Sequence, residues 1–344
     1  MTRRQGSHQS RCWGVQAIRL EPGPAGCCYG AMASSGMTAR AWWLFLAVSV
    51  LWGIPYLFIK LAVEDISPIW VAFGRIVVAL VVLIPYAWHK GALRGIDKRW
   101  KPLLVYSVVE ICLPWPLIGF GEERVSSGLA AILIAAVPLI IAVIALRVDR
   151  EERAEGARLV GLIVGFAGVV VLLGLDVAGR PGELLGALAI LLAAIGYAVG
   201  PMIIKHRFGD LDPLGPVTAS LGISAVVLAP FAAFSAPPAM PSTQTLLSVI
   251  VLGLACSALG FLLFFALIHA VGPGRATVIT FVNPVVAVAL GIALLGEGLG
   301  PSAVAGLLLI LAGSWLSTGG RLPPGLMLRV PGRRRGGDAL AQRS

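Results

Sequence analysis

The chain has 344 residues, of which 58% are hydrophobic and 13% are charged, and its formal net charge is +10. So few polar side chains cannot cover a soluble globule of this length, so we expect the chain to use lipid as its solvent. The basic residues lie in tails and short loops that cannot form a folded basic domain. This distribution argues against nucleic acid as a partner.

Both ends of the chain have the composition of disordered tails. Residues 1–40 are rich in Gly, Ser and Arg and contain no apolar block long enough for a signal peptide. We predict that they form a disordered tail or an over-extended reading frame, with Met32 and Met37 as alternative starts. Residues 320–344 are rich in Pro, Gly and Arg, which predicts a solvated basic arm near anionic headgroups.

Between the tails, apolar blocks alternate with short turn-rich or charged breaks. A helix needs about 20 apolar residues to cross a hydrocarbon core about 30 Å thick. The blocks are too long and too uninterrupted for the strands of a membrane barrel, so we predict helices. The ten predicted transmembrane helices lie near residues 42–62, 69–88, 102–121, 127–147, 157–175, 183–204, 213–234, 246–270, 275–296 and 302–319.

The distribution of charged residues predicts the orientation. Lys and Arg concentrate in both tails and in the even-numbered loops, for example at Lys90 and Arg94. The odd-numbered loops contain mainly acidic residues, among them Glu64, Glu122 and Glu123. Because cationic loops remain on the cytoplasmic side, we predict a multi-pass protein of the inner (plasma) membrane with both termini cytoplasmic.

The stretch from Gly128 to Gly168 recurs in weaker form from Gly274 to Gly313. Both copies keep a proline within the span and the spacing Glu-x8-Gly-x6-Gly, which indicates a duplicated membrane protein. The corresponding pairs are Pro138 and Pro284, Glu152 and Glu297, Gly161 and Gly306, and Gly168 and Gly313.

Five spans per copy is an odd number, so the second copy starts on the opposite side of the membrane. The predicted fold is therefore an all-α integral membrane protein with ten transmembrane helices in two inverted five-helix repeats, residues 41–180 and 181–319. Two such halves can exchange roles around a site near the midplane, which favours a transporter that works by alternating access.

Particular residues resemble those of the EamA family in the drug/metabolite transporter superfamily, over roughly residues 41–319. This resemblance implies ten helices in two inverted repeats, and movement of small metabolites, amino acids or toxic organic compounds across the bacterial inner membrane, often as export. The first copy departs from the family's Gly-Glu pair, and the equal spacing to the following glycines favours Glu152 over Glu151. The matching residues are Leu51-Trp52-Gly53, Lys60, Arg75, Arg124 to Ala131, Pro138 and Gly296-Glu297.

Three ionisable residues inside the predicted spans are candidates for the substrate or proton pathway, because each is costly there. Glu110 lies about 12 Å deep in the third span at the helical rise; it is either a carboxyl that exchanges a proton or pairs with a cationic substrate, or a structural carboxyl that faces a neighbouring helix. Arg75 either snorkels to the outer headgroups or turns inward as an anion clamp or partner of Glu110. For Lys60, at the outer end of the first span, snorkelling is the ordinary explanation and a pathway role the alternative.

Two proline-containing sites are further candidates. Asn283 precedes Pro284, which frees a backbone carbonyl near mid-bilayer; the amide either coordinates substrate or bonds within the broken helix or to another helix. Pro114 and Pro116 flank Trp115 and predict a bend one turn beyond Glu110. Trp115 either faces a cavity, where its ring can stack on substrate or hold a cation, or anchors in lipid. We expect helix kinks at the cavity at all four prolines, Pro138 included.

The repeated small residues and glutamates have structural explanations. Gly161, Gly168, Gly306 and Gly313 permit close approach of helices. Glu152 and Glu297 lie at span ends, where we expect them to accept hydrogen bonds from the first amides of the next helix.

Other classes of function fit the sequence less well. A membrane scaffold or sensor would not need a buried carboxyl, and an intramembrane enzyme would need a nucleophile or metal motif that the sequence lacks. We therefore predict no enzyme activity, no metal and no cofactor. ATP is not the direct energy source because no Walker A loop exists. The expected partners are a small-molecule substrate and the bilayer, and a homodimer remains open.

Overall fold

A computed structural model describes residues 38–148, 157–173, 180–272, 276 and 278–317, and the regular structure within these ranges is helical. These residues belong to one compact unit that begins at Met37. Apart from residues 38–40, the predicted tails lie outside the described residues, and so does Glu152. Helix α1 begins at Ala39, before the expected boundary, because the Thr38 side chain caps it by accepting from Ala41 N.

Seven helical stretches in the described ranges are long and apolar enough to cross a membrane, and three further apolar helices are shorter. The shorter ones are Leu159–Val171, Ile279–Leu295 and Pro301–Ser317. The ten predicted blocks thus correspond to seven full-length helical stretches and three short ones. In chain order the helices are α1 Ala39–Gly53, α2 Pro55–Val63, α3 Pro68–His89, η1 Asp97–Arg99, α4 Trp100–Ser107, η2 Val108–Cys112, α5 Pro114–Glu122, α6 Ser127–Ile134, α7 Val137–Val148, α8 Ala157–Val171, α9 Pro181–Phe208, α10 Leu214–Phe234, α11 Thr243–Val251, η4 Leu252–Leu259, α12 Gly260–Val271, α14 Ile279–Leu295 and α15 Pro301–Ser317.

Four spans that we predicted as single helices are divided. The first breaks between α1 and α2, where Pro55 takes the first helical position, and the fourth breaks between α6 and α7 just before Pro138. The third and eighth spans each contain a π-helical segment, η2 and η4. Pro114 begins α5 directly after η2, so the interruption of the third span falls where the prolines predict a bend. Pro284 instead lies inside the continuous α14.

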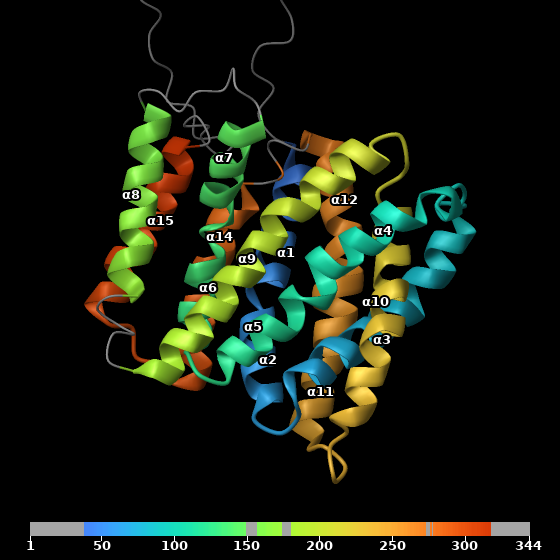
Figure 1. The fold of residues 1–344 in the computed structure, drawn as a ribbon, viewed down its shortest axis with the longest axis horizontal. Coiled ribbons are helices and arrows are strands. Elements are labelled where there is room, and N and C mark those ends of the chain that lie inside the picture. The colour runs from blue at the N-terminus through green and yellow to red at the C-terminus, as the bar shows by residue number, and fades with distance from the viewer. Residues whose placement is uncertain (1–37, 149–156, 174–179, 273–275, 277, 318–344) are drawn as a thin grey trace, which may run out of the picture. The chain divides into compact units, whose positions relative to one another are not determined.

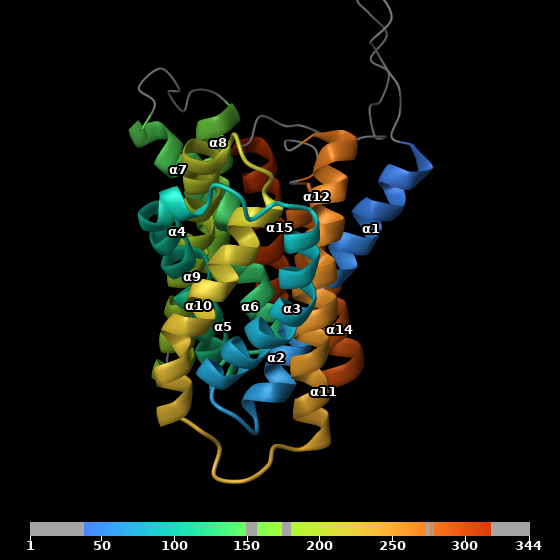
Figure 2. The ribbon, with the colours of Figure 1, turned by 90° about the vertical axis from the view of Figure 1, so that its right-hand side faces the viewer.

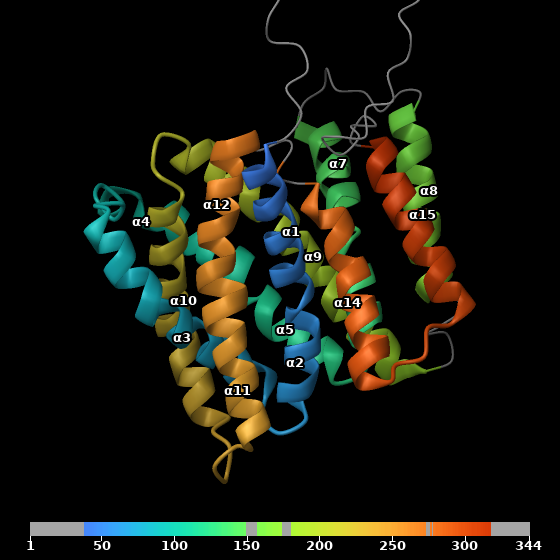
Figure 3. The same ribbon diagram turned by 180° about the vertical axis from the view of Figure 1, so that it is seen from behind.

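Helices of the two halves pack in corresponding pairs. Helix α1 of the first half packs against α12 and α14 of the second half. In the same way, α9 of the second half packs against α5 and α6 of the first half. Figure 1 shows α9 between α5 and α6, and Figure 3 shows α1 between α12 and α14. Helix α3 packs against η4, and α10 packs against η2. Three further contacts join helices in corresponding positions of the two halves, namely α3 with α10, α6 with α14, and α8 with α15.

Figures 1 and 2 show the start of α1 and the end of α15 at the same end of the helices. The loop between α10 and α11 lies at the opposite end. Large apolar side chains such as Val81 and Leu308 are exposed along the helices, which fits a lipid-facing surface. The exposed Trp43 and Trp88 lie near helix ends, where tryptophan is favoured at a membrane interface.

The glycine stripe brings α8 and α15 into close contact. A Cβ added to Gly313 would lie 2.4 Å from the Gly165 Cα and 2.6 Å from the Gly161 carbonyl oxygen. A Cβ on Gly168 would lie 2.9 Å from the Gly306 oxygen. These backbones therefore approach too closely for any side chain, as the small-residue spacing predicts.

Candidate functional site

Glu110 lies in the π-helical segment η2, with one carboxylate oxygen buried and without a hydrogen-bond partner. The amide of Leu113 donates to the Val108 carbonyl at 3.0 Å, five residues back, which widens the helix at this turn. π-Helical turns are uncommon and frequently occur at functional sites. The described residues include no ion pair to Glu110, so the predicted pairing with Arg75 is not formed here.

Helix α9 makes room for this carboxyl with two glycines. A Cβ on Gly200 would lie 1.7 Å from the Glu110 Oε2 atom, and one on Gly196 would lie 2.3 Å from the Val109 carbonyl oxygen. The π segment therefore rests directly on the α9 backbone. Glu110 therefore lies at the contact between the two halves of the chain, where its carboxyl faces the neighbouring helix α9.

Arg75 turns inward rather than toward the headgroups. Its guanidinium lies 3.9 Å from the centre of the Trp115 ring, and its Nε donates to the Ser257 hydroxyl at 2.7 Å. Trp115 is 7% exposed, which excludes its role as a lipid anchor. The three residues come from α3, α5 and η4, so the cation joins the two π-containing spans.

Two tyrosines lie near this cation, one buried (Tyr56) and one partly buried (Tyr197). Tyr56 of α2 and Tyr197 of α9 both lie within electrostatic range of Arg75. Tyr197 also lies within range of Glu110, and Tyr56 within range of Glu122. The sequence did not single out either tyrosine, because an isolated Tyr in an apolar block is indistinguishable from a core residue.

Asn283 is engaged with protein carbonyls. In the amide orientation that satisfies its hydrogen bonds, the Asn283 side-chain nitrogen donates to two carbonyl oxygens. These are Ser49 on α1 at 3.1 Å and Ile279 on its own helix at 2.9 Å. A Cβ on Gly53 would lie 3.0 Å from the Asn283 carbonyl oxygen, so the break in the first span contacts this site. These bonds are those of the structural alternative for Asn283.

Lys60 bonds backbone carbonyls beyond its own helix. Its ammonium donates to the Glu122 carbonyl oxygen at 2.5 Å and to the Val125 carbonyl oxygen at 3.0 Å. The first acceptor is the last residue of α5 and the second lies in the turn that follows it, where carbonyls lack partners within the helix.

Glu297 caps a helix, but of the other half of the chain. Its carboxylate accepts from the Ser127 amide at 2.7 Å, the Ser127 hydroxyl at 2.9 Å and the Gly128 amide at 3.1 Å, all at the start of α6. We expected bonds to the helix that follows in sequence. The tertiary contact between α14 and α6 instead brings a different helix N-terminus to this carboxylate.

The sequence placed Glu122 in an outer loop, but the structure buries it among the helices. It is the last residue of α5, fully buried, and neither carboxylate oxygen has a hydrogen-bond partner. Its neighbour Glu123 is exposed and bonds to Arg124 at 2.6 Å. Loop charge counting cannot separate two adjacent glutamates, whereas their burial differs completely.

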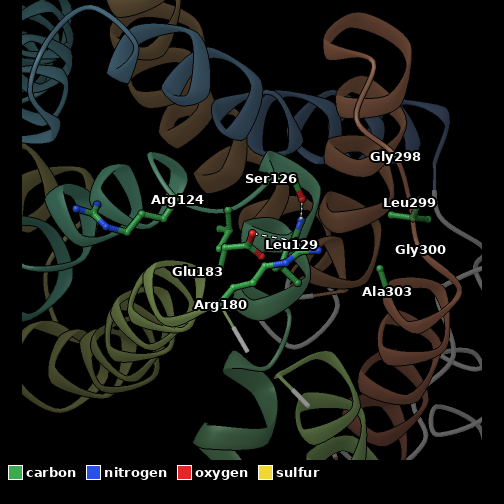
Figure 4. Close-up of a pocket in the computed structure, with 10 residues that line it drawn as sticks. Arg124, Ser126, Leu129, Arg180, Glu183, Gly298, Leu299, Gly300 and Ala303 are labelled. Carbon is green, nitrogen blue, oxygen red and sulfur yellow. Dashed lines mark hydrogen bonds and ion pairs between the residues drawn. The ribbon is translucent and has the colours of Figure 1, made fainter. Parts of the chain in front are cut away.

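A pocket of about 260 Å³ opens next to the Glu297 contact, between α6, α9 and α15 (Figure 4). Arg180 and Glu183 lie side by side at the start of α9 and form an ion pair of 2.9 Å, while Arg124 points away from them. None of the four prolines predicted to kink helices at a cavity lines this pocket. Its lining residues are Arg124, Val125, Ser126, Leu129, Arg180, Glu183, Gly298, Leu299, Gly300 and Ala303.

The long apolar helices, with ionisable side chains such as Arg75 and Glu122 between them, define a multi-pass membrane protein. A family model for EamA-like transporters matches residues 39–174 and 184–319, so the chain contains two copies of this unit. The chain belongs to the EamA-like transporter family.

Several relatives are named as transporters. The chain is 29% identical over 264 residues to the uncharacterized inner membrane transporter YedA of Escherichia coli, covering 74% of this chain and 82% of that protein. It is 24% identical over 280 residues to an uncharacterized transporter of Archaeoglobus fulgidus, covering 80% of this chain and 97% of that protein. A solved structure titled "Crystal structure of protein" matches with a TM-score of 0.58 and 19% identity, covering 81% of this chain and 96% of that one, which supports the fold alone.

Proposed function

We propose that the protein is a secondary active transporter that exports small organic metabolites, amino acids or drug-like compounds by alternating access, with Glu110 as its proton-binding or substrate-binding carboxyl. The buried, unpartnered Glu110 oxygen in a π-helical turn carries this proposal. A carboxyl without hydrogen-bond partners in a low-dielectric site is best accommodated as the neutral acid, or next to a cation that a substrate supplies.

The neighbouring residues support a binding role. Trp115 lies on α5, directly after the π segment of Glu110, and its ring contacts the Arg75 guanidinium of α3, so a cation and an aromatic ring are present. Together with the Glu110 carboxyl they offer groups of both charges and an apolar face, which suits small amphipathic or zwitterionic solutes. Asn283 contributes to the proposed pathway by fixing α1 against α14.

The proposed architecture is ten spans in two inverted repeats. It rests on the exchange of corresponding helix pairs between the halves and on the two family matches. Five spans per half invert the second copy, and the lysine and arginine distribution assigns both termini to the cytoplasm. Reporter fusions after Thr318 and within residues 237–241 test this topology, and they must report opposite sides of the membrane.

The functional test uses the purified protein in proteoliposomes with and without a pH gradient, screened against panels of amino acids and cationic dyes. We expect Glu110→Gln to retain folded yield and thermal stability, because the amide fills the same volume, while transport driven by the pH gradient is lost. Glu110→Asp should retain partial activity with a shifted pH profile.

Glu123→Gln is the matched control, because it removes the same charge from an exposed position in the turn that follows the same span. It should transport at the parent rate. A Glu110→Gln protein that also transports at the parent rate would contradict the assignment and move attention to Arg75.

A further inference from the structure

Glu122 occupies a buried position that the proposed transport site does not use. It lies on the same span as Glu110, about 18 Å further along at a helical rise of about 1.5 Å per residue. The side chain has no exposed surface and both of its oxygens are without partners. An ionised carboxylate enclosed in this way is strongly unfavourable, so the enclosed form is the neutral acid.

The charged and titratable groups around Glu122 come from several elements. Helix α2 contributes Lys60 and Tyr56, α3 contributes Arg75, and the segment after α14 contributes Glu297. Helix α6, Ser127–Ile134, contains no titratable residue. Lys60 is the nearest available cation, and it bonds the backbone carbonyl of Glu122 rather than the carboxyl group.

The same lysine closes the turn between α5 and α6, residues 123–126. Its ammonium bonds carbonyls on both sides of Glu123 and Arg124. The other side of the turn is fixed by Glu297 from the second half of the chain, which holds the Ser127 and Gly128 amides. The α5–α6 turn is therefore closed by one contact from each repeat, and the lysine contact adjoins an unpaired carboxyl.

We infer that Glu122 is a second proton-binding carboxyl that controls closure of the α5–α6 turn through Lys60. When Glu122 releases its proton to water, the new carboxylate attracts the Lys60 ammonium away from the two carbonyls, because an ion pair in a buried site outweighs bonds to neutral acceptors. The turn then loses its α2 contact and opens. Protonation neutralises the carboxyl, and the ammonium returns to the carbonyls.

This inference deepens the proposed proton coupling and rests on it only for the role of the proton in transport. The closure itself is measured without a substrate. Hydrogen–deuterium exchange of the full chain in nanodiscs, followed over a pH series, reports the protection of the 121–130 region. Protection factors corrected for intrinsic exchange, with the 235–242 loop as internal reference, separate opening from the ordinary pH dependence of exchange.

In the parent protein we expect protection of the α5–α6 turn to fall by about tenfold or more as pH rises, because two bonds to a charged donor are lost. Glu122→Gln should stay protected at every pH, since the amide cannot ionise. Lys60→Met should lack the pH-dependent step and remain poorly protected. Glu123→Gln is the matched control and should keep the step of the parent.

A Glu122→Gln protein with the same pH-dependent step as the parent would overturn the inference, and so would a parent without a step. If Glu122→Gln does not fold, Lys60→Met decides, because a step that persists without the ammonium contradicts the mechanism. Since this readout needs no transport, loss or retention of activity in Glu110 variants leaves its outcome unchanged.

Discussion

The two π-helical segments occupy corresponding positions in the third and eighth spans but carry different chemistry. Segment η2 holds Glu110 with an unpartnered oxygen. Segment η4 holds Ser257, which accepts from Arg75 at 2.7 Å, and Cys256, whose carbonyl oxygen accepts from the Trp52 indole at 3.1 Å. The π-helical segment therefore holds an ionisable side chain in the first repeat and hydrogen-bond acceptors in the second.

This difference indicates that the two repeats have different chemical roles. The first repeat supplies the buried Glu122 and the partly buried Lys60, Arg75 and Glu110, while the second supplies Ser257 and the partly buried Glu297 cap. A π-helical turn leaves backbone carbonyls available and disturbs local packing. Each copy of such a turn in a duplicated chain can therefore take a different role. The predictions below test whether the two segments differ in function as they do in chemistry.

The largest structural effect is expected at Gly200, which sets the space for Glu110. A Cβ there would lie 1.7 Å from the Glu110 Oε2 atom, so Gly200→Ala should lower the free energy of unfolding by about 3 kcal/mol or more and displace the carboxyl. Thermal unfolding and pH-driven transport measure both consequences.

Gly222→Ala in α10 is the control, because a Cβ there meets nothing within 4 Å. It should be neutral or slightly stabilising through helix propensity. A Gly200→Ala protein as stable as this control would show that η2 does not depend on close contact with α9.

Ser257→Ala tests the second π segment. Loss of the bond to the Arg75 guanidinium should destabilise the protein by about 1.5–3 kcal/mol and shift the apparent KM for substrate, while transport retains its response to a pH gradient. Abolition of the pH response by this variant would mean that η4 shares the role assigned to η2. Arg75→Lys complements it, because a lysine keeps the charge but loses the flat contact with Trp115.

Glu297→Gln tests the cap that joins the repeats. The amide nitrogen would face donors at the start of α6, so we expect a loss of about 0.5–2 kcal/mol and lower folded yield, with transport retained in the surviving protein. Exposed Glu64→Gln is the control. From the sequence repeat we predict the same direction for Glu152→Gln. Normal yield with abolished transport in both variants would contradict a structural role.

The smallest effect is expected at Asp65, which links the halves away from both π segments. Its carboxylate accepts from the Ser242 amide at 2.7 Å, and this bond holds the pKa of Asp65 below its ordinary value. A depressed pKa contributes stability above the unfolded-state pKa, and this contribution is lost as pH falls through the folded-state value.

Asp65→Asn should therefore lower the melting temperature slightly at neutral pH, and the difference from the parent should vanish in acid. A difference that persists unchanged at acidic pH would show that the bond does not depend on ionisation.

The sequence alone predicted the membrane class, the approximate position of each span and the duplication. These features follow from long apolar blocks and from spacing, which depend little on packing. The sequence also selected Glu110, Arg75 and Trp115, because an ionisable or broken position inside an apolar block is unfavourable wherever the helix lies. The structure brings the last two together at 3.9 Å.

Only the tertiary structure decided which way these side chains point and what they contact. A count of residues gives depth along a helix but not the direction around its axis, so Glu122 and Glu123 are indistinguishable in the sequence. Lys60 and Glu297 find their partners on α5 and α6 because helix packing brings unpaired backbone groups to them. The π segments likewise arise where the third and eighth spans pack against both repeats, a long-range condition that the local sequence does not contain.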